Sequence, residues 1–157
     1  MNSEASLRPM RLEDVPVVAE IDRLSFSLPW PERSFLHEVE ENDCSRCWVA
    51  EGTENDRPRV VGMLVLWLIL DEAHIATLAV HPAYRRRGIG KKLLHHALYA
   101  AWREGARRAM LEVRIGNQAA QTMYRESGFI IAGIRPRYYK DTGEDAVLMT
   151  LEPLEVP

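Results

Sequence analysis

A basic, glycine-containing loop, Arg85-Arg86-Arg87-Gly88-Ile89-Gly90-Lys91, is the segment with the clearest capacity to bind a ligand. It follows an apolar, strand-like run that ends at Val80, and a helical pattern of apolar residues comes after it. The first backbone N–H groups of a helix have no partners within the helix, and the helix dipole places positive potential there. Glycine at positions 88 and 90 lets the backbone approach a bound group closely and adopt positive φ. We therefore expect the loop to bind a pyrophosphate.

This loop matches neither of the two common phosphate-binding fingerprints. A Walker loop has four residues between its glycines and then Lys with Ser or Thr. The dinucleotide fingerprint has a third glycine at the position that Leu93 occupies here. A solvent-exposed basic turn at the start of a helix is therefore an alternative interpretation.

Glu112 and Tyr124 are candidates for acid–base chemistry. Glu112 lies in the middle of an expected strand, on the face opposite its two apolar neighbours. A carboxylate there is unusual unless it is paired or used, and a salt bridge with Arg114 is the alternative. Tyr124 lies in the next helical pattern, one turn before Gly128, and a core tyrosine is its alternative. A carboxylate and a phenol near a phosphate-bearing group suggest a base and an acid.

The elements that would position these residues alternate along the chain. The hydrophobic pattern predicts a mixed α/β fold with a central sheet, part parallel and part antiparallel, flanked by about four helices. Strands are expected over residues 6–10, 47–51, 60–70, 75–80, 109–114, 129–133 and 146–151. Helices are expected from Glu13, over 34–41, from Gly90 to near Gly105, and over 118–127.

Local sequence signals specify the buried face of the first helix and the two ends of the last. The first should bury a face made of Val17, Val18, Ile21 and Leu24. The last should be capped at its N-terminus by Asn117 and ended by Gly128 in the left-handed conformation.

The segment 25–31 cannot be regular, because two prolines flank Trp30. This apolar, aromatic loop is expected to be either packed on the core or a wall of a substrate site, and the sequence leaves both open.

Composition excludes several classes of function. The 157 residues suggest a single domain over 1–157, with an ordinary 46% of hydrophobic residues. A net charge of −3 argues against nucleic-acid binding. The longest apolar run, 60–70, is too short to span a bilayer, and residues 1–4 lack a signal pattern, so a cytoplasmic location is expected.

Cys44 and Cys47 form a single Cys-x-x-Cys pair. A zinc site would need two further ligands, and the chain has no other cysteine. We expect reduced thiols and no metal.

Taken together, these motifs resemble the GNAT superfamily of N-acetyltransferases. The resemblance covers nearly the whole chain. The residues that carry it are Leu28-Pro29-Trp30-Pro31-Glu32, Leu78 through Pro82, Arg85 through Gly90, Leu111 through Arg114, Asn117, Ala119-Ala120, Tyr124, Gly128-Phe129, Tyr138-Tyr139 and Glu144-Asp145-Ala146. The Pro29-Trp30 loop and the tyrosine pair point to the branch that acetylates peptide N-termini, and within it to bacterial enzymes that act on a ribosomal protein.

The resemblance implies acetyl-CoA as co-substrate. Strands ending at Val80 and bearing Glu112 would splay apart around the pantetheine arm. Main-chain groups of Leu78, Ala79 and Val80 would pair with that arm, and Asn117 and Tyr124 would also contact the coenzyme. The N–H groups from Arg85 to Lys91 would hold the pyrophosphate.

The implied reaction is direct attack of an α-amine on the thioester. At pH 7 only about a tenth of α-amines are neutral, so a base is needed. By resemblance Glu112 is that base, acting through water, with a pKa raised by partial desolvation, and Tyr124 is the acid that protonates the departing thiolate. A backbone N–H near Leu78 or Val80 would stabilise the oxyanion.

The acceptor groove would have Tyr138 and Tyr139 on one wall and Leu28 and Trp30 on the other. By the same resemblance, the loop at 28–30 would favour an acceptor whose first residue is Ala, Ser or Thr. An alternative is an acetyltransferase that acts on a small-molecule amine or a protein lysine. The oligomeric state and any delivering partner are open.

Overall fold

The computed structural model describes residues 5–155, and its strands form a seven-stranded mixed sheet with the order β1-β2-β3-β4-β5-β7-β6. The strands are β1 (Ser6–Pro9), β2 (Ser45–Glu54), β3 (Arg57–Ile69), β4 (Glu72–Val80), β5 (Arg108–Arg114), β6 (Ile130–Arg135) and β7 (Ala146–Leu151). The helices are α1 (Val15–Ser25), α2 (Glu32–Glu40), α3 (Ile89–Arg103) and α4 (Gln118–Glu126), with short 3-10 turns η1 (Leu12–Asp14) and η2 (Pro82–Tyr84). The predicted mixed α/β fold is confirmed.

The chain divides into two compact units. The first consists of the residues up to Trp67 together with 76–97, and the second of residues 68–75 together with those from Leu98 onward. The expectation of a single domain over residues 1–157 stays a prediction.

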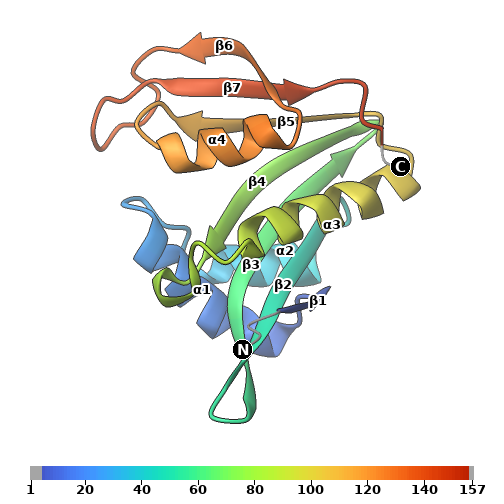
Figure 1. The fold of residues 1–157 in the computed structure, drawn as a ribbon, viewed down its shortest axis with the longest axis vertical. Helices are drawn as coiled ribbons and strands as arrows, with labels where there is room; N and C mark the ends of the chain where they lie inside the picture. Colours follow the sequence, from blue (N-terminus) through green and yellow to red (C-terminus); the bar gives the residue numbers. More distant parts are fainter. Residues whose placement is uncertain (1–4, 156–157) are drawn as a thin grey trace. The chain divides into compact units, whose positions relative to one another are not determined.

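In the first unit, α1 and α2 cover one face of β2 and β3, and the start of α3 covers the other (Figure 1). Met63 and Val65 belong to the same buried cluster as Phe35 of α2. On the opposite face, a Cβ at Gly62 would lie 3.1 Å from Leu93 Cδ1, so the absence of a side chain there lets α3 pack closely. Side chains alternate along β3, so this strand packs against helices on both faces of the sheet.

The first helix corrects one detail of the sequence prediction. Val18 and Ile21 are buried as expected, but Val17 and Leu24 are exposed. A buried stripe of α1 instead follows the spacing i, i+3, i+4 and i+7 from Val15, and one member of this stripe is a carboxylate. The residues on this stripe are Val15, Val18, Ala19 and Asp22.

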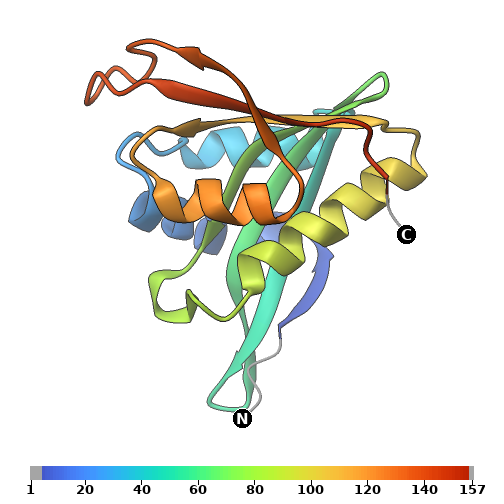
Figure 2. The same cartoon turned by 45° about the horizontal axis from the view of Figure 1, so that its top comes forward.

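In the second unit, β5 pairs in parallel with the first part of β4 and antiparallel with β7. The parallel register runs from Glu72↔Arg108 to Ile75↔Leu111. Helix α4 lies along β5 (Figure 2), and Asn117 Oδ1 accepts a 3.1 Å hydrogen bond from the Ala120 N–H as the predicted N-cap. Gly128 has φ +104, so the predicted helix end is confirmed as well.

None of the helices within residues 5–155 is long and apolar enough to cross a membrane.

Candidate active site

The basic loop of the first unit ends in the first turn of α3. Gly88 adopts φ +80, and its carbonyl accepts a 3.0 Å hydrogen bond from Lys92 N, which starts the helical ladder. The N–H groups from Gly88 to Lys91 therefore precede the ladder. A Cβ on Gly88 would meet nothing within 4 Å, so the space beside this backbone is open. This arrangement fits the pyrophosphate of a coenzyme.

Arg85 and Arg87 of the loop make contacts with other residues of the first unit. Arg85 Nε donates to the Val80 carbonyl at 2.9 Å, and Arg85 Nη2 donates to Ser25 Oγ at 3.0 Å. The Arg87 guanidinium lies 5.0 Å from the centroid of the Tyr84 ring. Arg86 adopts the left-handed conformation, with φ +65. The sequence predicts positive φ at glycines and does not predict it at Arg86. The Arg85 contacts tie the loop to the end of β4 and to the end of α1.

Trp30 and Leu28, the two predicted acceptor residues of the first unit, differ in their surroundings. The Trp30 ring lies 5.1 Å from Phe35 and stacks at 6.3 Å on Trp67. Its backbone N–H donates to the buried carboxylate of Asp22 at 2.7 Å. Leu28 is exposed. Trp30 is therefore fixed by packing and by Asp22, whereas the Leu28 side chain protrudes.

A buried carboxylate that the sequence did not single out supports this region. Glu38 Oε1 accepts hydrogen bonds from Trp67 Nε1 at 2.6 Å, Ser45 Oγ at 2.7 Å and Asn42 Nδ2 at 3.1 Å. Its helical spacing from Phe35, i and i+3, placed it on the inward face of α2 and was the available signal. Glu38 thus fixes the indole on which Trp30 stacks.

Glu112 of the second unit has two partners from beyond its own strand. Its Oε1 accepts a 3.1 Å hydrogen bond from the Tyr138 hydroxyl, and Arg135 Nε lies 3.2 Å from Oε2. The alternative interpretation of Glu112, a salt bridge with Arg114, is wrong in its partner, because the ion pair is formed with Arg135. The Glu112 side chain is 32% exposed, so it is partly shielded from solvent.

Strand register explains why Arg135 is the partner. Glu112 is opposite Leu148 of β7, and Leu148 is opposite Gly133 of β6. Residues 133 and 135 share a face of β6, and Gly133 carries no side chain there. Arg135 can therefore reach across β7 to the Glu112 carboxylate.

Tyr124 is buried in α4, where its ring lies 5.7 Å from that of Phe129. Burial raises the pKa of Tyr124 well above its usual range, so its hydroxyl keeps its proton at neutral pH. The pKa of Tyr139 is also raised, to about 12, mainly by burial and to a smaller extent by the negative charge of Glu112. The hydrogen bond to Glu112 raises the pKa of Tyr138. The hydroxyl groups of all three tyrosines are therefore protonated near neutral pH.

The predicted site residues fall into two groups, one in each unit. The first unit carries Leu28, Trp30, Leu78, Ala79, Val80 and the loop from Arg85 to Lys91. The second carries Glu112, Asn117, Tyr124, Tyr138 and Tyr139, and the structure brings Glu112, Tyr138 and Tyr139 together. Within residues 5–155, no three His, Cys, Asp or Glu side chains form a group that could hold a metal ion, and Cys44 and Cys47 are free thiols.

A sequence model of the acetyltransferase (GNAT) family matches residues 15–129, which include both groups except Tyr138 and Tyr139. The chain belongs to the GNAT acetyltransferase family. It is therefore an acetyl-CoA-dependent N-acetyltransferase, as the motifs predicted.

Individual GNAT relatives match the chain over almost its whole length. The [ribosomal protein bS18]-alanine N-acetyltransferase of Escherichia coli (strain K12) is 33% identical over 153 residues, which cover 96% of this chain and 97% of the relative. A protein of Bacillus subtilis (strain 168) that carries this name provisionally is 39% identical over 149 residues, 95% and 96% of the two chains. The crystal structure of the ribosomal-protein-S18-alanine N-acetyltransferase from Escherichia coli has a TM-score of 0.84 at 30% identity and covers 98% of this chain and 96% of that one.

Proposed function

We propose that this GNAT enzyme acetylates the α-amine of a protein N-terminus, and that its acceptor is a ribosomal protein whose first residue is small, such as Ala, Ser or Thr. The observation that carries the proposal is the identity of 33–39% with relatives named as ribosomal-protein-alanine N-acetyltransferases, over 95% or more of the chain. Such an acceptor implies that the enzyme acts in the cytoplasm.

Glu112 is the proposed base. An α-amine has a pKa near 8, so most of it must lose a proton before it can attack at pH 7. The carboxylate is partly open to solvent, while Tyr138 and Arg135 orient its two oxygens. That exposure supports a role in which Glu112 accepts the proton through a water molecule.

Tyr124 is the proposed acid. Its raised pKa keeps the phenol protonated, so that it has a proton to donate to a departing thiolate. Tyr124 also lies on the helix that Asn117 caps, and we propose that Asn117 contacts the pantetheine arm of the coenzyme.

Acetyl-CoA supplies the acetyl group as a thioester. We propose that the backbone N–H groups of residues 85–91 hold its pyrophosphate and that main-chain groups of Leu78, Ala79 and Val80 pair with its pantetheine arm. The open space beside Gly88 supports this assignment. Leu28, Trp30, Tyr138 and Tyr139 would bind the acceptor peptide, for which the exposed Leu28 and Tyr138 offer contact surface.

The test is acetyl transfer by the purified chain to three matched acceptors. The first is a peptide with a free N-terminal alanine, the second is the same peptide with a blocked N-terminus and a lysine, and the third is spermidine. We expect mass spectrometry to find the acetyl group on the α-amine of the first. Faster transfer to the lysine peptide or to spermidine would overturn the proposal in favour of an enzyme that acts on a side-chain or small-molecule amine.

A further inference from the structure

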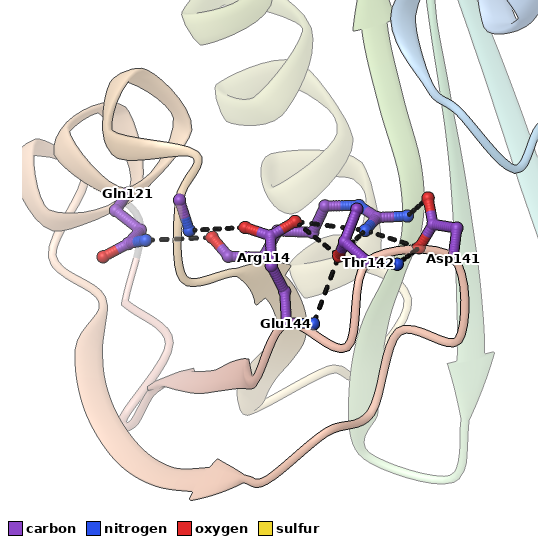
Figure 3. Close-up of polar contacts among 6 residues, drawn as sticks. Arg114, Gln121, Asp141, Thr142 and Glu144 are labelled. Carbon is purple, nitrogen blue, oxygen red and sulfur yellow. Dashed lines mark hydrogen bonds and ion pairs between the residues drawn. The ribbon is translucent and has the colours of Figure 1, made fainter.

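Arg114, at the end of β5, holds the segment between β6 and β7, residues 136–145, which we call the tyrosine loop. Arg114 Nη1 and Nη2 lie 2.9 and 3.0 Å from the two carboxylate oxygens of Asp141, and Nη1 also lies 3.2 Å from Glu144 Oε1 (Figure 3). The centre of the guanidinium lies 4.1 Å from the centroid of the Tyr139 ring. One planar cation thus contacts the tyrosine loop at four residues, Tyr139, Asp141, Thr142 and Glu144, with the forked geometry that only arginine offers.

Glu144 extends this contact to the corner between β5 and α4. Its Oε2 accepts a 3.1 Å hydrogen bond from Gly116 N, and the Asp145 carbonyl accepts one of 3.1 Å from Ile115 N. A Cβ on Gly116 would lie 2.5 Å from Glu144 Oε2, so only glycine lets the carboxylate reach this N–H group. We call the residues of this contact the clamp: Arg114, Gly116, Asp141 and Glu144.

Helix α4 fixes the same corner from its other side. The buried side chain of Gln121 donates to the Arg114 carbonyl at 3.0 Å (Figure 3). It also donates to the Ile115 carbonyl at 2.9 Å. Helix α4 therefore holds the corner through contacts that do not involve the tyrosine loop.

The tyrosine loop has no apolar anchor of its own. None of the residues from 136 to 145 is buried. Loops without buried side chains order only where polar contacts offset the loss of conformational freedom. The clamp supplies those contacts, and its main ion pair is sheltered, with side chains 19% and 16% exposed for Arg114 and Asp141.

We propose that the clamp positions Tyr138 and Tyr139 for binding of the acceptor peptide, and so sets the KM for that peptide. Arg114 is a positioning residue in this scheme, because it acts through the tyrosines. The tyrosine loop also carries Tyr138, whose hydroxyl donates a hydrogen bond to Glu112. The inference rests on the proposed function, since it needs an acceptor that the tyrosines contact.

Gly116→Ala and Arg114→Lys test the clamp from its two sides. The methyl group of Gly116→Ala displaces the Glu144 carboxylate, which is the flexible end of its side chain, so we expect the fold to persist. Arg114→Lys keeps the charge but loses the fork and the stacking on Tyr139. We expect each variant to raise the KM for the peptide about tenfold and to change the KM for acetyl-CoA less than about twofold.

Arg108→Lys is the matched control. Arg108 lies on the same strand and pairs with Asp71, Glu72 and Glu152, all away from the tyrosine loop. We expect both of its KM values to match those of the wild type. Hydrogen exchange at the amides of Tyr139 and Gly143, which bond within the loop, should accelerate in the two clamp variants and not in the control.

Two outcomes overturn the inference. One is an unchanged peptide KM in both clamp variants while the wild type acetylates the peptide. The other is an equal rise of the KM for peptide and for acetyl-CoA, which would indicate a general loss of structure. If the wild type acetylates no N-terminal peptide at all, the proposed function fails first and the role of the clamp in acceptor binding fails with it.

Discussion

The Tyr138 hydroxyl and the Glu112 carboxylate are joined by a 3.1 Å hydrogen bond, although 26 positions separate the two residues in the sequence. Arg135 Nε lies 3.2 Å from the other carboxylate oxygen. Both oxygens of the proposed base are therefore oriented by side chains of β6 and the loop after it. The orientation of Glu112 depends on how that loop is placed.

Tyr138→Phe should lower kcat/KM for an acceptor peptide by roughly three- to tenfold, because the loss of one hydrogen bond leaves the carboxylate less well oriented. The same hydrogen bond raises the pKa of Tyr138. The contribution of this hydrogen bond to the stability of the fold is therefore present below pH 10, and it is lost as the pH rises through the raised pKa of Tyr138. Steady-state kinetics at pH 7.5 provides the measurement, with Tyr99→Phe, an exposed tyrosine of α3, as the control. Equal activity of Tyr138→Phe and wild type would contradict the expectation.

Glu112→Gln and Tyr124→Phe should each lower kcat by about a hundredfold or more, as expected for loss of a general base or acid. Neither change removes a group proposed to hold the coenzyme's phosphates, so the Kd for acetyl-CoA measured by calorimetry should stay within about twofold. Wild-type turnover in either variant would remove that residue from the mechanism.

The pH dependence of kcat should show no alkaline decline below about pH 10. Burial places the pKa of Tyr124 well above its usual range, so this acid stays protonated while the amine and the base become more reactive. Initial rates between pH 6 and pH 10 test this. A decline that begins near pH 8 and disappears in Tyr124→Phe would show that the phenol ionises far earlier than its burial implies.

Local patterns predicted the elements of this chain well because each depends on neighbouring residues. Asn117 caps α4, Gly128 ends it, and alternation puts Glu112 opposite its buried neighbours. The first helix was harder, since several spacings of apolar residues fit its sequence. The stripe from Val15 to Asp22 includes a charged residue that no hydrophobic pattern would select.

The candidate site was predictable only in part, because its contacts join distant segments. Arg114 stood on the expected face of β5, yet its carboxylate partners come from the tyrosine loop, and Arg135 reaches Glu112 across β7. These pairings depend on the register of β5, β7 and β6, which residue types alone do not reveal. Glu38 also escaped notice, since its donors come from β2, from β3 and from the turn after α2.

Gly88→Ala should raise the Kd for acetyl-CoA about tenfold, since the methyl group would enter the open space proposed for the pyrophosphate. Gly105→Ala is its matched control. Both glycines have positive φ, +80 and +109, and a Cβ on either would meet nothing within 4 Å. Both variants should therefore lose about 1 kcal/mol of unfolding free energy through backbone strain, measured by urea denaturation. Equal Kd values for the two variants would argue against phosphate binding at this loop.

Asp22→Asn should flatten the dependence of stability on pH. Burial raises the pKa of Asp22, against the effect of the hydrogen bond from Trp30 N, and Oδ1 is buried without a hydrogen-bond partner. The folded state therefore holds this proton more tightly than the unfolded state, whose value is about 3.9. Wild-type stability must fall as the pH rises from about 3.9 through the raised value, because ionisation leaves a buried charge.

The asparagine variant keeps a carbonyl oxygen for Trp30 N but cannot ionise, so the Asp22-dependent fall should be absent. Thermal unfolding of both proteins between pH 4 and pH 7 measures the difference, and Asp43→Asn, an exposed carboxylate, controls for the loss of one charge. The Tm of the wild type should decline relative to that of Asp22→Asn as the pH rises, and that of Asp43→Asn should follow the wild type. A constant Tm difference between wild type and Asp22→Asn over this range would mean that Asp22 is already ionised at pH 4 in the folded protein. The loop that carries Trp30 would then be held by a full charge.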